Sequence, residues 1–370
     1  KRGTFKKNIL PLHMGNEINT IKPRKIAIVC FSAISNVAAI VPQLYSLTKR
    51  YPDNEYIVIS RSFLKPLFSS LSNTTFIGAD IRGVHSTAKG IFLLFKELQK
   101  HNPDVLLDMQ LSWRTKLLSL FCSINKIKSY SINIYKKDQH RLTSKGANKY
   151  HPIKTIFQRQ EELYKRIGLH CDSTFTSLPE PTPIQKQKIT DTYGEKGNAF
   201  WVGIAPFSMA KGKTLPLKKM KNVLSALDKE PNTKIFLFGA GEMENEMLND
   251  WQSIYHNVYA VHTKLQLDEE LALMYHLDIM LTMDSANMHL ASLMAVPVIS
   301  IWGATHPYAG FVGWKQDINN CIGVDFSCRP CTIHKDTPCK YGDYRCLESI
   351  HSTKIIDTIL KFKPKEKENG

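Results

Sequence analysis

A short polar turn between two apolar runs contains the residues with the clearest chemical potential in this chain. Asp284 and Ser285 follow a predicted strand, and His289 comes one helical turn later. Asp and Ser favour the start of a helix, where unpaired N–H groups and the positive end of the helix dipole suit a diphosphate. The alternative is that Asp284 or Ser285 only caps the helix and His289 only packs in the interior.

Four of the eight cysteines form a second group with chemical potential. Cys328 and Cys331 have the spacing of a zinc knuckle, and Cys339 and Cys346 follow. We favour thiols that only pack a loop, and therefore predict no metal requirement. A zinc site and a disulfide formed on oxidation are the alternatives.

The elements that must position these residues alternate between apolar runs and helical patterns. Runs such as 25–31 and 104–108 are typical of buried parallel strands, and helical spacing fills the segments between such runs. A second series extends from 200–205 to 298–302. The chain is therefore predicted to be α/β, with two doubly wound domains of the Rossmann type. Ligands of such sheets bind beyond the carboxyl ends of the strands, so we expect a central cleft that both domains face.

Local changes in residue composition indicate where these domains begin and end. The Pro-rich run 178–183 marks a junction, and the basic, polar segment 136–154 is predicted to be a loop. We expect the last helix to return to the first domain. The predicted units are a basic tail at 1–24, an N-terminal domain at 25–183, a C-terminal domain at 184–350, and a helix with a charged tail at 351–370.

The charge of the chain limits its partners without choosing one. The 370 residues include 49 Lys and Arg against 33 Asp and Glu, a formal net charge of +16. Such an excess suits nucleic acid, an anionic membrane surface or phosphorylated small molecules. We expect no nucleic-acid partner, because the sequence has neither a repeated zinc module nor an aromatic platform for bases.

No membrane-spanning or export segment is predicted. The sequence has no apolar run of about eighteen residues, the length that a spanning helix needs. The tail at 1–24 is basic and lacks an apolar centre, so it does not read as a secretory signal. We expect this tail to be a solvated arm, with a membrane-surface contact as the alternative.

The segment from Leu281 to Thr305 resembles the signature of glycosyltransferase family 9, the heptosyltransferases. An Asp-Ser turn leads into a helix with a histidine, and a proline, a strand and Gly303-Ala-Thr follow. The resemblance extends from about residue 25 to residue 360. It departs from the family at Ala286, where glycine is usual. Alanine does not adopt positive φ cheaply, so we expect a slightly different phosphate loop.

The resemblance implies a phosphate loop after the strand at 200–205. Ser208, Lys211 and Lys213 would contact the phosphates of the donor. Lysine provides the point charge that phosphate binding requires. A solvated basic loop is the alternative for this segment.

The resemblance also implies a glycine-rich turn, Phe238–Glu242, next to the ribose of a nucleotide. Gly239 lies in this turn, and Glu242 would accept hydrogen bonds from the ribose hydroxyls, with Glu244 as a second candidate. Either carboxylate could instead complete the acidic first turn of a helix.

The first loop differs from the family at the catalytic position. Where the family has Gly-Asp, this sequence has Ser35-Asn36, and the family's Asp is the proposed general base. An amide cannot accept the proton, and a general base is worth roughly 10²–10⁴-fold in rate. Asn36 could still orient the acceptor hydroxyl. Three alternatives stay open: another base such as Asp108 or His140, a slow enzyme, or a protein that binds without transfer.

The family resemblance implies a GT-B-like fold and inverting, metal-independent sugar transfer. The acceptor hydroxyl would attack the anomeric carbon while lysines and helix dipoles stabilise the leaving nucleoside diphosphate. The lack of an Asp-x-Asp motif agrees with this mechanism. We expect ADP-heptose as the donor, no required cofactor, and a lipopolysaccharide-core or similar glycolipid acceptor at the inner membrane face.

The expected location is cytoplasmic, with peripheral membrane contact as an option. The main alternative function is a catalytically impaired, sugar-nucleotide-binding homologue, which Asn36 supports. A nucleotide-sugar epimerase of the same fold is a further alternative, and the signature around Asp284 argues against it.

Overall fold

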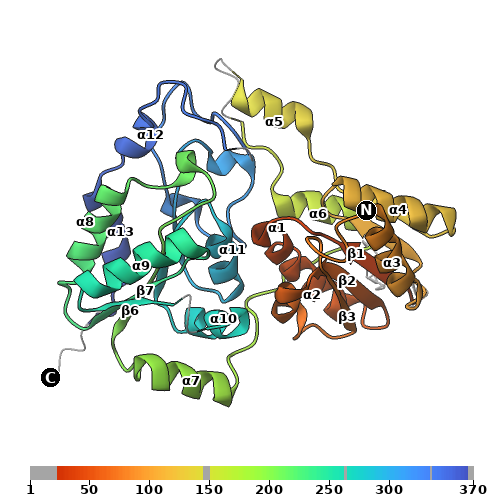
Figure 1. The fold of residues 1–370 in the computed structure, drawn as a ribbon, viewed down its shortest axis with the longest axis horizontal. Helices are drawn as coiled ribbons and strands as arrows, with labels where there is room; N and C mark the ends of the chain where they lie inside the picture. Colours follow the sequence, from red (N-terminus) through yellow and green to blue (C-terminus); the bar gives the residue numbers. More distant parts are fainter. Residues whose placement is uncertain (1–22, 145–150, 262–264, 334–335, 366–370) are drawn as a thin grey trace, which may run out of the picture.

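A computed structural model describes residues 23–144, 151–261, 265–333 and 336–365. Most of the predicted tail at 1–24, and the end of the tail at 351–370, lie outside the described residues. The described chain forms two α/β lobes that lie side by side (Figure 1). Within the described ranges, every helix falls short of the length and hydrophobicity that a transmembrane span requires.

The N-terminal lobe has a parallel five-stranded sheet of order β3-β2-β1-β4-β5. The central strand β1 is buried because helices cover both faces of the sheet, and its alternate residues enter two separate apolar clusters. The strands are β1 (Lys25–Val29), β2 (Glu55–Arg61), β3 (Thr74–Ala79), β4 (Val105–Asp108) and β5 (Lys128–Ser131). The helices are α1 (Ile34–Ala38), α2 (Val41–Arg50), the 3₁₀ helix η1 (Ser62–Phe68), α3 (Ala88–Gln99), α4 (Trp113–Ile124), α5 (Lys136–Thr143) and α6 (Ile156–Lys165).

The C-terminal lobe has a parallel six-stranded sheet of order β11-β10-β9-β6-β7-β8. Its strands are β6 (Phe200–Ala205), β7 (Thr233–Leu237), β8 (Val258–Ala260), β9 (Ile279–Met283), β10 (Val298–Ile301) and β11 (Cys321–Ile322). Its α-helices are α7 (Pro183–Tyr193), α8 (Leu217–Leu227), α9 (Glu242–Ile254), α10 (Leu267–Tyr275), α11 (Ala286–Leu293), α12 (Arg345–Glu348) and α13 (Ser352–Leu360). The 3₁₀ helices η3 (Lys211–Lys213), η4 (Pro307–Ala309) and η5 (Ile318–Asn320) lie in its loops.

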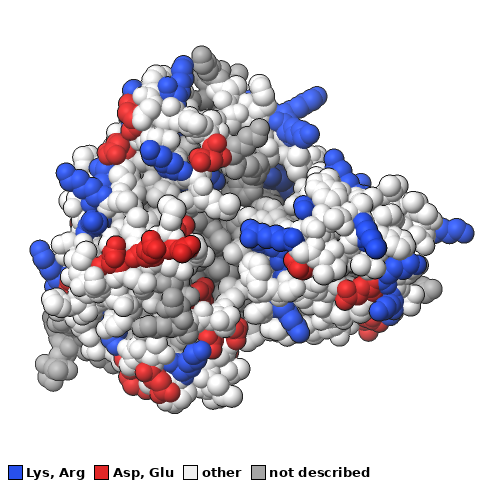
Figure 2. Space-filling view, viewed as in Figure 1, with Lys and Arg blue, Asp and Glu red and all other residues white. Residues whose placement is uncertain are grey.

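The lobes meet where helices leave the carboxyl ends of their central strands. Helix α1 follows β1 and packs against α11, which follows β9, and α10 packs against η1. One apolar cluster runs through this contact and includes Val37 of α1 and Met288 of α11. The carboxyl ends of both sheets therefore approach each other, and the surface is hollowed between the lobes (Figure 2). The predicted α/β class with two doubly wound sheets is confirmed.

The predicted return of the last helix to the first domain is wrong. Helix α13 packs against α8 of the C-terminal lobe. Ile355 and Ile359 lie one turn apart and are fully buried in that lobe's apolar cluster. The Ser352 hydroxyl donates to the Lys219 carbonyl at 3.2 Å. The apolar side of α13 packs against the apolar side of α8, and the helix therefore belongs to the C-terminal lobe.

The prediction of a loop at 136–154 is wrong at Lys136–Thr143, where α5 forms, and residues 145–150 lie outside the described residues. Leu142 is its one buried residue. Leu142 packs with Ile153 and with Ala309 and Ile333 of the C-terminal lobe. One buried apolar residue thus holds in place a polar helix whose sequence pattern predicts a loop. Helix α5 links the two lobes at one edge (Figure 1).

Glu270 on α10 should make stability depend on pH. Burial raises the pKa of Glu270 to about 7. The Glu270 carboxyl therefore binds its proton more tightly in the folded than in the unfolded state. Its ionisation lowers the free energy of unfolding as pH rises from about 4.5 through 7. We expect Glu270→Gln to raise Tm by roughly 3 °C at pH 8 and by much less at pH 5.

Thermal unfolding of Glu270→Gln and wild type at the two pH values measures this difference. Glu269→Gln is the matched control, because Glu269 is paired with Lys188 at 2.5 Å and its pKa is lowered by that ion pair and by hydrogen bonds. The control should lower Tm at pH 8. An equal gain for Glu270→Gln at both pH values would contradict the expectation.

Candidate functional site

Asp284 forms the centre of a polar cluster at the carboxyl end of β9. Its Oδ2 accepts hydrogen bonds from Lys213 Nζ at 2.7 Å and from Thr305 Oγ1 at 2.8 Å. The Lys213 and Asp284 side chains are only 14% and 10% exposed. The Ser208 hydroxyl lies 3.4 Å from the Asp284 carbonyl, to which it donates. Three loops that are distant in sequence therefore meet, and partial burial strengthens the ion pair relative to water.

Two glycines allow this convergence. The Gly212 carbonyl accepts a hydrogen bond from the Ala304 N–H at 2.7 Å. A Cβ atom on Gly303 would lie 2.4 Å from that same oxygen, and one on Gly212 would lie 2.9 Å from the Ala304 methyl group. Only glycine fits this approach, which holds Lys213 beside Asp284.

The start of α11 has helix N–H groups without a side-chain cap. Ser285 occupies the N-cap position but makes no capping hydrogen bond. Its hydroxyl pairs with that of Thr282 at 2.9 Å instead, so Ser285 stands at the predicted N-cap position without a capping hydrogen bond. Ala286 begins the helix with ordinary helical backbone, and alanine is unstrained there. The first turn of α11 thus offers donors and a positive dipole end beside Lys213.

His289 lies in the interior, in line with the packing alternative. It is 3% exposed. Burial lowers the pKa of His289 to about 4, against the opposing effects of Asp284 and a hydrogen bond to the Phe311 backbone. The imidazole is therefore neutral at physiological pH and supports α11 from within.

Lys211 lies apart from the Asp284 cluster. Its side chain is exposed, and Nζ lies 5.1 Å from the centre of the Tyr344 ring. Tyr344 comes from the cysteine-rich loop, which sequence analysis did not connect to the phosphate loop. The contact is a cation–π interaction at the rim, where the lysine stays accessible to a ligand.

The glycine-rich turn is closed by Glu244 rather than by Glu242. Glu244 Oε2 accepts a hydrogen bond from the Ala240 N–H at 3.0 Å. A Cβ atom on Gly239 would lie 2.8 Å from Leu248, so the turn packs tightly on α9. Glu242 is exposed in the first turn of α9. Figure 2 shows a row of acidic side chains where α9 lies in Figure 1.

Asn36 lies on α1, the helix that packs against α11. Its Nδ2 donates to the Ser32 hydroxyl at 2.7 Å. The contact between the two helices brings the N-terminal loop close to the Asp284 cluster. Asn36 therefore lies on the helix through which the N-terminal lobe contacts α11.

The two other candidate bases differ from Asn36 in their surroundings. Asp108 is fully buried, and its Oδ1 accepts hydrogen bonds from the N–H groups of Gln110 and Leu111, both at 2.9 Å. Burial raises the pKa of the Asp108 carboxyl, against the effect of these hydrogen bonds. Asp108 thus shapes the turn after β4. His140 is exposed on α5.

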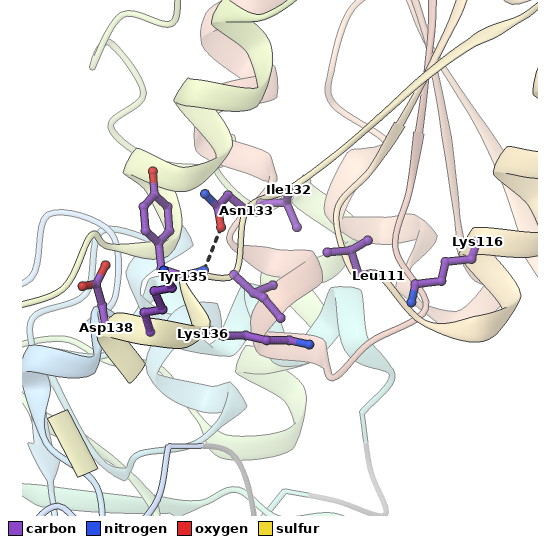
Figure 3. A pocket seen from close by; sticks show the side chains of 9 residues that line it. Leu111, Lys116, Ile132, Asn133, Tyr135, Lys136 and Asp138 are labelled. Carbon is purple, nitrogen blue, oxygen red and sulfur yellow. Dashed lines mark hydrogen bonds between the residues drawn. The ribbon is translucent and has the colours of Figure 1, made fainter. Parts of the chain in front are cut away.

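A cavity of about 530 Å³ lies beyond the carboxyl end of β5, and sequence analysis missed it. Its lining includes Lys116, Asn133, Tyr135 and Lys136 (Figure 3). The Tyr135 N–H donates to Asn133 Oδ1 at 2.9 Å, which fixes the turn into α5. Its lysines make it suited to an anionic sugar or a phosphate.

The cysteine-rich loop supports the Asp284 cluster. All eight cysteines are free thiols, and no three metal-ligating side chains converge in the parts of the chain that the structure describes. The Cys331 N–H donates to the Ala304 carbonyl at 2.8 Å. The buried Arg329 donates to the carbonyls of Gly303 and Thr305 at 2.7 and 3.0 Å. The loop thus holds the Gly303–Thr305 turn in place.

Comparisons with known proteins identify the family and the fold of the chain. The model of glycosyltransferase family 9 (heptosyltransferase) matches residues 91–342. The chain is 22% identical over 329 residues to lipooligosaccharide heptosyltransferase 2 of Campylobacter jejuni, covering 87% of this chain and 93% of that protein. The solved family 9 glycosyl transferase of Veillonella parvula has a TM-score of 0.73 at 16% identity, covering 92% of this chain and 97% of that one. E. coli ADP-heptose lps heptosyltransferase II has a TM-score of 0.64 at 16% identity, covering 91% and 98%.

Proposed function

Because the chain belongs to glycosyltransferase family 9, we propose that it transfers heptose from ADP-heptose to a lipopolysaccharide-core or similar glycolipid. The transfer inverts the anomeric carbon and needs no metal ion. The observation that carries this proposal is the cluster of Lys213, Asp284 and Thr305 at the start of α11. The names of the heptosyltransferase relatives support the donor and the acceptor.

In this proposal the diphosphate binds at the start of α11. The helix N–H groups and Lys213 contact its oxygens, with Ser208 and Lys211 alongside. The Lys213 ammonium has a ready partner in Asp284 before the donor arrives, at 2.7 Å. It then shares its charge with the phosphates as the bond to the anomeric carbon breaks. These fixed charges stabilise the leaving group in the place where other enzymes use Mg²⁺.

The N-terminal lobe provides the acceptor side. The acceptor hydroxyl approaches past α1, where Asn36 orients it by hydrogen bonding. The basic cavity beyond β5 lies on the same lobe. We place the enzyme at the cytoplasmic face of the inner membrane, where it reaches its glycolipid by peripheral contact.

The second candidate function is a homologue that binds the sugar nucleotide but transfers poorly. Asn36 favours it, because the amide that donates to Ser32 cannot accept a proton. Donor binding would be unchanged in such a protein, so binding and turnover must be measured separately.

Calorimetric titration with ADP, UDP and GDP, first without metal and then with Mg²⁺, tests the donor site. We expect ADP to bind without metal and the other two nucleotides to bind more weakly. Strict dependence on Mg²⁺ would contradict the metal-independent mechanism. Lack of binding by all three would contradict donor recognition itself.

A further inference from the structure

Helices α3 and α4 carry a large share of the exposed apolar surface. Six of the fourteen large apolar side chains exposed in the described chain come from residues 84–124. They are Val84, Phe92, Leu93, Trp113, Leu120 and Ile124. An ordinary soluble surface scatters such residues singly, so this concentration points to an interaction surface.

The exposed apolar side chains of α4 share one side of that helix, and Phe92 of α3 adjoins it. Trp113, Leu120 and Ile124 are spaced by seven and four residues, so they share one side of α4. Helices α3 and α4 pack side by side (Figure 1). The Phe92 ring on α3 contacts Phe121 on α4 with 5.4 Å between ring centres. We call this surface the α3–α4 face.

Basic side chains lie beside the aromatic groups of the α3–α4 face. Residues 109–137 include six Lys and Arg and no Asp or Glu, and Glu97 is the one acid on the two helices. Lys96 Nζ lies 5.5 Å from the centre of the Phe92 ring, and Arg114 Cζ lies 4.5 Å from that of Trp113. Figure 2 shows several basic side chains and a smaller group of acidic ones on the lobe that contains these helices. Aromatic groups with long basic side chains beside them are typical of surfaces that bind the membrane interface.

We propose that the α3–α4 face docks on an anionic lipid bilayer. The apolar side chains enter the boundary between headgroups and acyl chains, and the lysines and arginines contact lipid phosphates. Charge complementarity favours this occupant over a second copy of the chain. A second copy would bring two basic rims together, whereas an anionic surface neutralises them.

Docking of the α3–α4 face would bring the cavity beyond β5 close to the bilayer. This inference about the acceptor rests on the proposed function. Lys116 belongs to α4 and also lines the 530 Å³ cavity. The cavity therefore lies at the N-terminal end of the same helix whose exposed side meets the bilayer. A glycolipid in that bilayer would place its sugars near Lys116 and Lys136 while its acyl chains stay in the membrane.

Flotation of the full chain with lipid vesicles tests the docking. Wild type should bind phosphatidylcholine vesicles that contain phosphatidylglycerol, should not bind pure phosphatidylcholine, and should lose binding as salt rises. Leu120→Glu combined with Ile124→Glu should weaken vesicle binding at least about tenfold, because it removes apolar contacts and adds two repelled charges. Both side chains are more than half exposed, so the fold should tolerate the two substitutions. Ile184→Glu, 82% exposed on α7, is the matched control and should bind like wild type.

Three results would overturn the docking proposal. The first is wild type that ignores anionic vesicles, and the second is a double variant that binds as tightly as the control. The third is a concentration-dependent dimer that the double variant abolishes in sedimentation, which would assign the face to a second copy. Transfer to a soluble, lipid-free acceptor and calorimetric ADP binding should be unchanged in the double variant. Failure of those two assays in wild type would count against the proposed function while leaving vesicle binding intact.

Discussion

Lys213→Ala is expected to lower kcat for sugar transfer by roughly 10²–10³-fold, the effect of removing one preorganised charge from a developing anion. Lys213 is the cation held beside the start of α11, and its side chain is largely shielded from water. The charge that we propose it supplies to the leaving diphosphate could not be replaced by solvent. Initial rates with ADP-heptose and a lipid-free acceptor measure the loss.

Two further variants separate chemistry from stability. Lys211→Ala removes an exposed lysine of the same loop, which contacts the Tyr344 ring, and should cost less than about tenfold. Lys213→Ala alone leaves the Asp284 carboxylate without its cation, which destabilises the fold. Adding Asp284→Asn should restore Tm without restoring kcat. Recovery of activity in that double variant would show that Lys213 acts only through stability.

Asn36→Asp should raise the transfer rate, by up to roughly 10²–10⁴-fold if a general base is all that the wild type lacks. The new carboxylate would keep its contact with Ser32 by accepting a hydrogen bond from the hydroxyl. It would also gain the capacity to take a proton from the acceptor. The pH–rate profile of the variant should acquire an acidic limb, because the base works only when ionised.

Asn36→Ala is the matched control for this substitution. It removes the amide without adding a base, and it should transfer more slowly than wild type if Asn36 orients the acceptor. An Asp variant no faster than wild type, with ADP binding intact, would place the base elsewhere or support the impaired homologue. A gain shared equally by the Ala and Asp variants would exclude base catalysis at this position.

The regular elements of the fold could be predicted because their signals are local. Strand β1 is a continuous apolar run. Strand β9 ends directly before the turn with Asp284, and a proline directly precedes β10. The resemblance to family 9, stated on that segment, is confirmed by the family model. Helix α5 escaped prediction because Leu142 alone anchors it.

The contacts within the site could not be predicted in the same way. Lys213 and Asp284 are separated by 71 positions, so their pairing depends on how β6 and β9 lie in one sheet. Thr305 was visible in the signature, but its role as a donor to Asp284 was not. Tyr344 lies in a distant loop, and its contact with Lys211 arises from the return of that loop to the phosphate loop. Burial of His289 likewise depends on what covers α11.

The apolar cluster that passes from α1 into α11 also determines how the chain is assembled. Val37 and Met288 belong to one core although 251 positions separate them. During synthesis, the apolar side of α1 that packs against α11 therefore stays exposed until β9 and α11 have left the ribosome. Such an exposed surface is a natural target for chaperones. Once closed, it ties the two lobes into a single cooperative unit, so heating should produce one unfolding transition rather than one for each lobe.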